Sequence, residues 1–300
     1  MMKTRIELNE VLENSPNIIL YGAPILIGLA LIEVILSMRH NKSKYEGKDF
    51  LSSLVIGLVH LVEGLFTKTG FFLLVIWLYN LVPWSIPVNI ATSVLCFVVL
   101  DFCRYWSHRL SHEINFLWAT HVTHHSSTQF NLSTAFRQSW TQGIKIIFYL
   151  PVSLLGFHPV IFYITHQLAL LYSFAVHTKS IKNLPKWYSY IFVTPSHHKV
   201  HHAKNAKYLD KNYGSALIIW DRLFNTFQEL DENEKPEYGI LDQPKTFNPI
   251  YLVFHVWVDI FKKMKAVKTF RERWDIFFKS PGYVKNELYL RKQESKFSNQ

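Results

Sequence analysis

Cysteine is nearly absent from this chain of 300 residues, which contains only Cys96 and Cys103. Both lie in an apolar stretch and form no CxxC pair, so the sequence indicates neither a disulfide framework nor a thiolate zinc site. Acidic residues are also in the minority, with 22 Asp and Glu against 32 Lys and Arg, and the formal net charge is +10. Such a charge suits an anionic surface, either a lipid headgroup layer or nucleic acid. Because no groove-reading motif accompanies it, we expect a membrane and no nucleic-acid partner.

The chain also lacks a linker, a low-complexity tract and an internal repeat, so we predict one domain over residues 1–300. Hydrophobic residues, by contrast, make up 49% of the chain and gather in long runs. The run from Asn17 to Met38 carries a single charge, Glu33, and is long enough to span a bilayer core. A signal peptide is the less favoured interpretation, because the basic segment before the run is weak and the run is long.

Two pairs of apolar runs follow along the chain. Residues 70–87 and 88–106 form the first pair, which turns at a proline- and tryptophan-rich segment of the kind that suits a membrane interface. Residues 143–157 and 159–177 form the second pair, whose members are short. We expect the first pair to cross the membrane and return, and the second pair either to span it with distortion or to stay partly submerged.

The orientation is predicted from the basic residues that follow the first run. These residues place the loop on the cytoplasmic side by the positive-inside rule: Arg39, Lys42, Lys44 and Lys48. Residues 50–66 contain His60 and Glu63 and are predicted to form an amphipathic helix on that surface. If they span the bilayer instead, the orientation of all later segments is reversed. The prediction is therefore an all-α, multi-pass, integral-membrane bundle of four to five embedded helices, with a cytoplasmic, histidine-rich helical cap that holds the active site.

Histidines are abundant, and most of the fifteen fall into three clusters. The first is the HxxxH pair His108 and His112, at the end of a predicted membrane helix. The second, HVTHH, begins at His121, and the third, HHKVHH, begins at His197 and repeats the HxxHH spacing. Residues three and four apart share one face of a helix, so each HxxHH can aim two imidazoles at one point. The adjacent histidine is displaced by about 100° and can reach a second metal ion.

The clusters contain more imidazoles than one metal ion uses, since one ion takes about four to six ligands, so we infer two ions. A structural zinc site is disfavoured, because such sites usually include cysteine. Imidazole suits iron, copper, nickel and zinc alike. We interpret His40, His60 and His255 as surface or core residues. Carboxylates that could orient the imidazoles by accepting N–H bonds flank the clusters: Asp101, Glu113, Asp210 and Asp221.

The segments around the histidines resemble the fatty acid hydroxylase / sterol desaturase superfamily. They are DFCRYWSHRLSH from Asp101, HVTHHS from His121, NLSTAFRQS from Asn131, LYSFAVHT from Leu171 and TPSHHKVHHAKNAKYLDKNYGSALIIWDRLFNT from Thr194. Within the superfamily they are most similar to the pterin-dependent branch that cleaves glyceryl ether lipids. The resemblance extends over residues 49–283.

This resemblance implies a set of nine metal-ligating histidines: His108, His112, His121, His124, His125, His177, His198, His201 and His202. His197 is an additional candidate, for which three alternatives are open: a ligand, a donor beside the ligands, or neither. The implied cofactors are two iron ions and a reduced pterin of the tetrahydrobiopterin type. Arg137 follows the second histidine block and is expected either to bind a polar head group or a cofactor, or to be a surface residue after a helix cap.

We therefore expect an oxidoreductase, a di-iron monooxygenase that hydroxylates a lipid C–H bond and thereby cleaves a glyceryl ether lipid. Its partners are the lipid, dioxygen and an electron donor. One alternative is a sterol or fatty-acyl desaturase or hydroxylase that uses another donor. A second alternative is a non-catalytic metal-binding or transport protein of the membrane. Transport is disfavoured, because it places ionisable residues deep inside the spans, whereas these histidines lie at helix ends and beyond.

Overall fold

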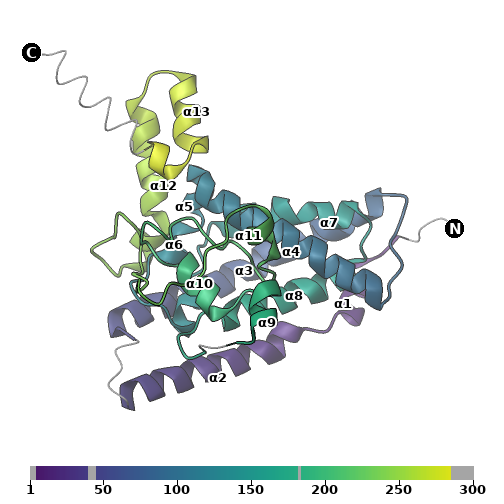
Figure 1. The fold of residues 1–300 in the computed structure, drawn as a ribbon. Helices are drawn as coiled ribbons and strands as arrows, with labels where there is room; N and C mark the ends of the chain where they lie inside the picture. Colours follow the sequence, from purple (N-terminus) through teal and green to yellow (C-terminus); the bar gives the residue numbers. More distant parts are fainter. Residues whose placement is uncertain (1–4, 40–44, 182–183, 285–300) are drawn as a thin grey trace, which may run out of the picture.

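The computed structural model describes residues 5–39, 45–181 and 184–284, and these ranges are mainly helical (Figure 1). They contain no β-strand, and the extended pairing within them amounts to two isolated bridges, Phe192 with Leu217 and Ala203 with Tyr238. The prediction of an all-α protein is therefore confirmed.

Helix α2 (Ile18–Arg39) follows the short helix α1 (Leu8–Asn14) and corresponds to the first predicted span. Its mean hydropathy of 2.4 and its length fit a bilayer crossing. Only 11% of its most apolar window is buried inside the protein. Many of its large apolar side chains, such as Leu20 and Ile25, are exposed, as expected of a helix with one face against lipid.

Helix α3 (Gly47–Leu81) corrects the sequence prediction. It is one helix of 35 residues, so residues 50–66 are its first part and not a separate helix on the membrane surface. The parts Gly47–Gly64 and Thr69–Leu81 meet at a bend of 45°, and together they have the composition of one broken span. No proline interrupts this stretch, and threonine and lysine are compatible with a helix interior. The helix therefore bends at the polar residues between the two parts, where the sequence prediction had one helix end and another begin.

Helix α4 (Ile90–Glu113) is a second candidate span and carries the first histidine pair in its last two turns. A capping box begins it: the Asn89 side chain accepts from the Thr92 amide (2.9 Å), and the Thr92 hydroxyl accepts from the Asn89 amide (3.0 Å). In the turn before it, the Ile86 amide donates to the carbonyl of Gly156 (2.8 Å). Gly156 has φ +89°, and a Cβ there would lie 2.8 Å from Trp84, so glycine is required where the two predicted turns meet.

The second predicted pair is present but too short to span by length: η2 (Gln142–Tyr149) with α7 (Leu150–Leu154), and α8 (Pro159–Ala175). These elements pack against α2, α3 and α4. Within the described ranges, two helices could each cross a membrane, and α3 is a third if its two parts form one span. The bundle thus has two or three helices long enough to span a bilayer, whereas the sequence led us to expect four to five embedded helices.

The remaining helices lie mainly on the side of the bundle where α4 ends (Figure 1). The pair α12 (Pro249–Ala266) and α13 (Phe270–Phe278) projects from the rest of the chain, at the yellow end of the ribbon. The other elements are short: α5 (Asn115–Ala119), α6 (Val122–His125), η1 (Leu132–Phe136), α9 (Lys186–Ile191), α10 (Pro195–His201) and α11 (Ile219–Leu223). Two of them, α6 and α10, bring histidines to the end of α4.

Candidate metal centre

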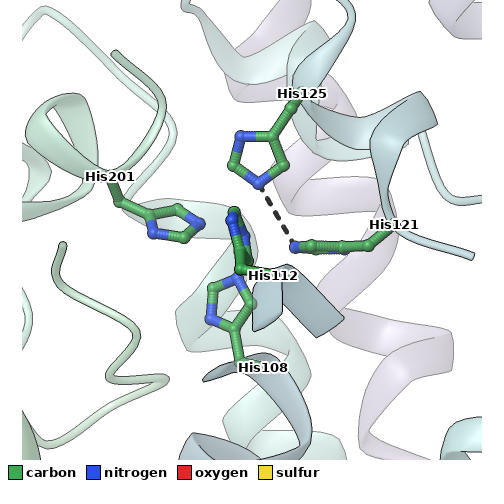
Figure 2. A group of neighbouring side chains, drawn as sticks. All are labelled: His108, His112, His121, His125 and His201. Atoms are coloured by element: carbon green, nitrogen blue, oxygen red, sulfur yellow. Dashed lines mark hydrogen bonds between the residues drawn. The ribbon is translucent and has the colours of Figure 1, made fainter. Parts of the chain in front are cut away.

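The nine histidines of the predicted set converge from four parts of the chain into two groups. In each group, one ring nitrogen of every histidine lies within 4.8 Å of the corresponding nitrogens of the others, so each group could hold a metal ion. The first group, drawn in Figure 2 with its rings around a common space, contains His108, His112, His121, His125 and His201. The second group contains His124, His177, His198 and His202.

The two HxxHH motifs divide their histidines between the groups in opposite ways. His121 and His125, four residues apart, belong to the first group, and the neighbouring His124 belongs to the second. In the other motif, His198 and His202 belong to the second group and His201 to the first. This is the arrangement that helical geometry predicts, because residues i and i+4 share a face and an adjacent residue points about 100° away.

Within the groups, the imidazole nitrogens approach one another closely. The Nε2–Nε2 distances are 3.2 Å for His121–His125, 2.8 Å for His177–His198 and 3.1 Å for His198–His202. Two nitrogens that bind one ion at about 2.1 Å and at right angles lie about 3.0 Å apart, so these spacings fit a shared ion.

Several of these nitrogens are buried without a partner. The Nε2 atoms of His108, His112 and His201 are shielded from solvent and accept or donate no hydrogen bond within the part of the chain that the structure describes. A buried polar atom without a partner is unfavourable by about 1–3 kcal/mol. A metal ion that binds these lone pairs would remove that penalty, so the residues present fit a metal centre.

In three of the nine histidines, a main-chain carbonyl contacts the opposite ring nitrogen and fixes the ring. Nδ1 of His108 contacts the carbonyl of Tyr213 (2.8 Å), and Nδ1 of His201 contacts the carbonyl of Lys211 (3.0 Å). His177 uses the carbonyl of Ser173, one helical turn away (2.7 Å). An Nδ1 proton donated to a carbonyl leaves the Nε2 lone pair free toward the centre, which is the tautomer that a metal ligand needs.

Burial keeps these rings neutral. Removal from water lowers the pKa of the seven grouped histidines that lie outside α4, and their mutual electrostatic repulsion lowers it further for six of them. For His177 burial lowers the pKa to about 4. At neutral pH each of these imidazoles therefore keeps a lone pair for a metal.

The carboxylates near the clusters act differently from the prediction, with one exception. Asp210 lies 3.4 Å from Nδ1 of His112, which is the expected contact with an imidazole. Glu113 instead binds Arg109. Asp101 accepts from the amides of Ala216 and Leu217 and from the indole of Trp220: 2.9, 3.0 and 3.0 Å.

Asp221 shapes the loop that faces the first group. Its carboxylate accepts from the amides of Tyr213 and Gly214, both at 2.7 Å. A Cβ at Gly214 would lie 2.6 Å from the Leu217 carbonyl, so this close loop requires glycine. Asp101 and Asp221 thus position the backbone whose Tyr213 carbonyl holds His108, and their effect on the imidazoles is indirect.

Histidines outside the nine lie apart from both groups. His197 is 4% exposed, and its amide and ring complete a capping box with Thr194 at the start of α10. His60 contacts Glu63 (3.2 Å), and His255 contacts the carbonyl of Leu252 (3.1 Å). His40 lies outside the described residues. The expectation that His60 and His255 are not part of a metal cluster fits this placement.

Arg137 is buried and held by protein groups. Its guanidinium donates to the Asp49 carboxylate (2.8 Å), the Ser53 hydroxyl (2.9 Å) and the Ser126 hydroxyl (2.9 Å). It is therefore not the surface residue of the alternative interpretation. A cavity of about 60 Å³ lies beside it, lined by Gln243 among others. This arrangement connects α3 to the end of the second histidine block.

A cavity of about 650 Å³ begins at the histidines and extends among the membrane helices. Five of its lining residues belong to the two metal groups: His108, His121, His124, His177 and His198. Apolar side chains from three helices line most of the rest, among them Leu26 of α2, Leu58 of α3 and Leu171 of α8. The volume lies in the range of cavities that enclose small organic ligands.

Two lining residues were missed by the sequence reasoning, Arg104 and Lys145. Lys145 is the only charged residue in the apolar run 143–157, and a single charge in such a run was the available signal. The backbone carbonyls that hold His108 and His201 were also missed, and no residue type could have indicated them.

Comparison with known proteins agrees with this centre. Residues 93–226, which include all nine histidines, match the fatty acid hydroxylase family. This match confirms the resemblance inferred from the sequence.

Over a longer stretch the chain is similar to alkylglycerol monooxygenases. It is 40% identical to the human protein over 286 residues, which is 91% of this chain and 62% of the relative. It is 35% identical to the Danio rerio protein over 279 residues, 91% of this chain and 61% of the relative. The chain thus spans about three-fifths of the length of these relatives. It is also 32% identical to the ornithine lipid hydroxylase OlsE of Rhizobium tropici, over 49% of this chain and 45% of that protein. No solved structure matches the chain.

Proposed function

We propose that this chain is an integral-membrane oxidoreductase that uses two iron ions and dioxygen to hydroxylate a C–H bond of a lipid. The observation that carries the proposal is the contact between two histidine groups and a largely apolar cavity among the membrane helices. A catalytic metal site needs such an open side for its substrate, whereas a structural site is closed by its ligands. The hydroxylase and monooxygenase relatives support this choice.

The proposed ligands are the nine histidines of the two groups. Their Nε2 atoms would hold the ions, while carbonyl acceptors at Nδ1 keep the rings of His108, His177 and His201 in place. His197 is proposed to act beside the ligands, because its ring is engaged at the start of α10. Arg137 stays a candidate contact for a head group or cofactor, and any such group would reach it by way of the 60 Å³ cavity.

When bound, the two ions supply dioxygen activation with two electrons from an external donor. The chain's own residues fix the ligand geometry and keep water away. Apolar side chains such as Leu58 and Leu171 would hold an alkyl chain in the cavity and present one of its carbons to the histidine end. Holding the carbon at a fixed position lowers the entropic part of the barrier and restricts oxidation to few carbons.

The proposed substrate is a glyceryl ether of a single alkyl chain, with a reduced pterin as electron donor. The names of the alkylglycerol monooxygenases suggest both an alkylglycerol and a monooxygenase reaction. Hydroxylation of the carbon next to the ether oxygen would give a hemiacetal, which separates into a fatty aldehyde and glycerol. A second candidate is hydroxylation of another lipid with another donor, which the similarity to the ornithine lipid hydroxylase favours.

The experiment supplies membranes containing the chain with an alkylglycerol, oxygen and either a tetrahydropterin or a ferredoxin-type donor, and measures fatty aldehyde. Aldehyde formation with the pterin supports the ether-lipid proposal. Turnover of a fatty acid or sterol with the second donor, and no aldehyde with the first, would exclude it and leave the lipid hydroxylase standing. Membranes with His201→Ala provide the control for background oxidation.

We also propose that the histidine side of the bundle faces the cytoplasm. The α3–α4 turn at Ser85 and the loop at Glu232 are both exposed. The proposed topology places them on opposite sides of the membrane. Cysteine at position 232 should react only from the cytoplasmic side and cysteine at position 85 only from the outside. Both native cysteines are buried, so background labelling should be low. The reverse labelling pattern would invert the proposed topology.

A further inference from the structure

Two basic residues line the large cavity near the histidines. Lys145, on η2, is 9% exposed and lines the cavity together with His108 and His124. Arg104, on α4, lies one helical turn before His108 and lines the same cavity. The cavity end at the metal groups is therefore basic, whereas the walls from α2 and α8 are apolar.

Within the described residues, the ammonium of Lys145 forms neither a hydrogen bond nor an ion pair. Arg104 donates to the hydroxyls of Ser215 (2.7 Å) and Ser173 (3.3 Å) and forms no ion pair in these ranges. Arg104 is half-buried and lies within electrostatic range of Asp101. Buried charges in proteins are normally paired, so the buried Lys145 beside a second cation requires an explanation.

The nearby carboxylates are engaged elsewhere. Glu63, which also lines the cavity, pairs with His60. Asp101 and Asp221 are bound by backbone amides, and Asp210 lies against His112. The nine imidazoles are neutral ligands, so metal ions bound to them would add positive charge to the same end of the cavity. No residue of the described chain supplies the compensating negative charge at Lys145.

Burial and the neighbouring Arg104 lower the pKa of Lys145 to about 7. The folded chain alone therefore does little to stabilise the protonated form of Lys145. A bound anion would stabilise that form, because an opposite charge at close range favours the protonated amine.

We propose that Lys145 and Arg104 form a subsite for an anionic oxygen group, a carboxylate or a phosphate, on the head of a single-chain lipid. The head then lies beside the metal groups, the chain extends along the apolar walls, and oxidation falls on carbons close to the head. This inference rests on the proposed function in taking the cavity as the lipid site. It deepens that function by adding a preference for charged lipids over neutral ones.

The test measures binding, so it does not depend on turnover. Purified chain in nanodiscs, with and without iron, is titrated with three lipids that share one alkyl chain and carry a glycerol, a carboxylate or a phosphate head. Wild type should bind at least one of the two anionic lipids on the order of tenfold more tightly than the glycerol lipid, since charge-assisted contacts in a buried site are strong. The two anionic heads show whether the subsite takes a carboxylate or a phosphate.

Three variants of the chain sharpen the test. Lys145→Met should remove the preference for the anionic lipid and change binding of the glycerol lipid by less than about threefold, because methionine keeps the volume without the charge. Lys145→Arg should retain the preference. Lys186→Met, which replaces an exposed lysine on α9, is the matched control and should behave as wild type.

Equal affinity of wild type for all three lipids would overturn the subsite. The same holds if Lys145→Met loses affinity for the neutral and the anionic lipids to the same extent. The wild-type comparison decides the question even if a variant fails to fold. A charge preference in a chain that shows no oxidation would support the subsite while contradicting the proposed reaction. Oxidation of neutral lipids without any charge preference would do the reverse.

Discussion

The outer face of α2 and the histidine centre show opposite relations between polarity and burial. On α2, large apolar side chains are exposed, among them Leu20 at 62% and Ile25 at 65%. At the centre, seven of the nine polar imidazoles are between 3% and 8% exposed. A soluble protein places these classes the other way round, because water is its solvent. The difference indicates that lipid surrounds the helices and that polarity is concentrated where the chemistry takes place.

The two regions should therefore differ in their response to substitution. In lipid, an outward apolar side chain has similar surroundings before and after folding, so changing it alters the stability little. In the centre, each ring contacts others of its group, and removal of one leaves buried partners unsatisfied.

Replacing a histidine of either group with alanine should have the largest consequence. His201→Ala in the first group and His124→Ala in the second should each reduce lipid oxidation by more than about 100-fold. Loss of a residue that only contacts a metal ligand typically lowers activity by about 10- to 100-fold, and loss of the ligand itself should lower it further. The measurement is product formation in membranes that hold equal amounts of chain. His255→Ala, which removes a histidine outside both groups, is the control and should keep wild-type turnover. Full activity in either of the first two variants would contradict the two-group assignment.

Breaking the buried ion pair between Arg137 and Asp49 should destabilise the fold strongly. Both side chains are nearly inaccessible, and Arg137→Ala leaves the Asp49 carboxylate buried without its partner. The expected loss is about 3–5 kcal/mol in the free energy of unfolding, measured by denaturant titration in detergent. Lys207→Ala removes an exposed ion pair with Asp231 and should change the stability far less. Similar losses in the two variants would show that Arg137 has no structural role.

Acidification should destabilise the metal-free chain. His177 has an ordinary pKa near 6.5 when unfolded and about 4 when buried in the fold. Below pH 6.5 the unfolded chain thus binds a proton that the folded chain does not, so stability is lost as the pH falls toward 4. His177 alone should contribute about 2 kcal/mol of this loss at pH 5. Thermal unfolding of metal-free protein at pH 7.5 and pH 5 measures it. His177→Gln should show a smaller pH dependence, and an unchanged dependence in that variant would exclude His177 as a source.

The smallest effect is expected on the outer face of α2. Leu29 is 49% exposed, and Leu29→Ala should change the stability in a bilayer by less than about 0.5 kcal/mol. Leu100, in the packed cluster with Val75 and Val152, is 1% exposed, and Leu100→Ala should lower the stability by about 2–5 kcal/mol. Equal losses at the two leucines would mean that the face of α2 is covered by protein and not by lipid.

Patterns that depend on helical periodicity were predictable from the sequence. The apolar run from Asn17 to Met38 correctly predicted α2. The HxxHH spacing correctly predicted that the histidines of each motif point to two different places, which are the two histidine groups. The continuity of α3 was not predictable in the same way, because a short polar interruption can either end a helix or bend it, and packing decides.

The surroundings of the histidines could not be obtained from the sequence either. The rings of His108 and His201 are held by main-chain carbonyls, which every residue carries. Asp101 and Asp221 lie close to the clusters in the sequence, but they bind the loop that brings one of those carbonyls into place. Contacts between distant parts of the backbone leave no local signature.

The central claim is that the histidines form two separate metal sites, and the metal content of the purified chain tests it most directly. Wild type reconstituted with iron should hold about two equivalents per chain. His201→Ala and His202→Ala are neighbouring substitutions that each remove a ligand from a different group, and each should retain about one equivalent. Wild type with a single equivalent, or both variants with two, would contradict the account.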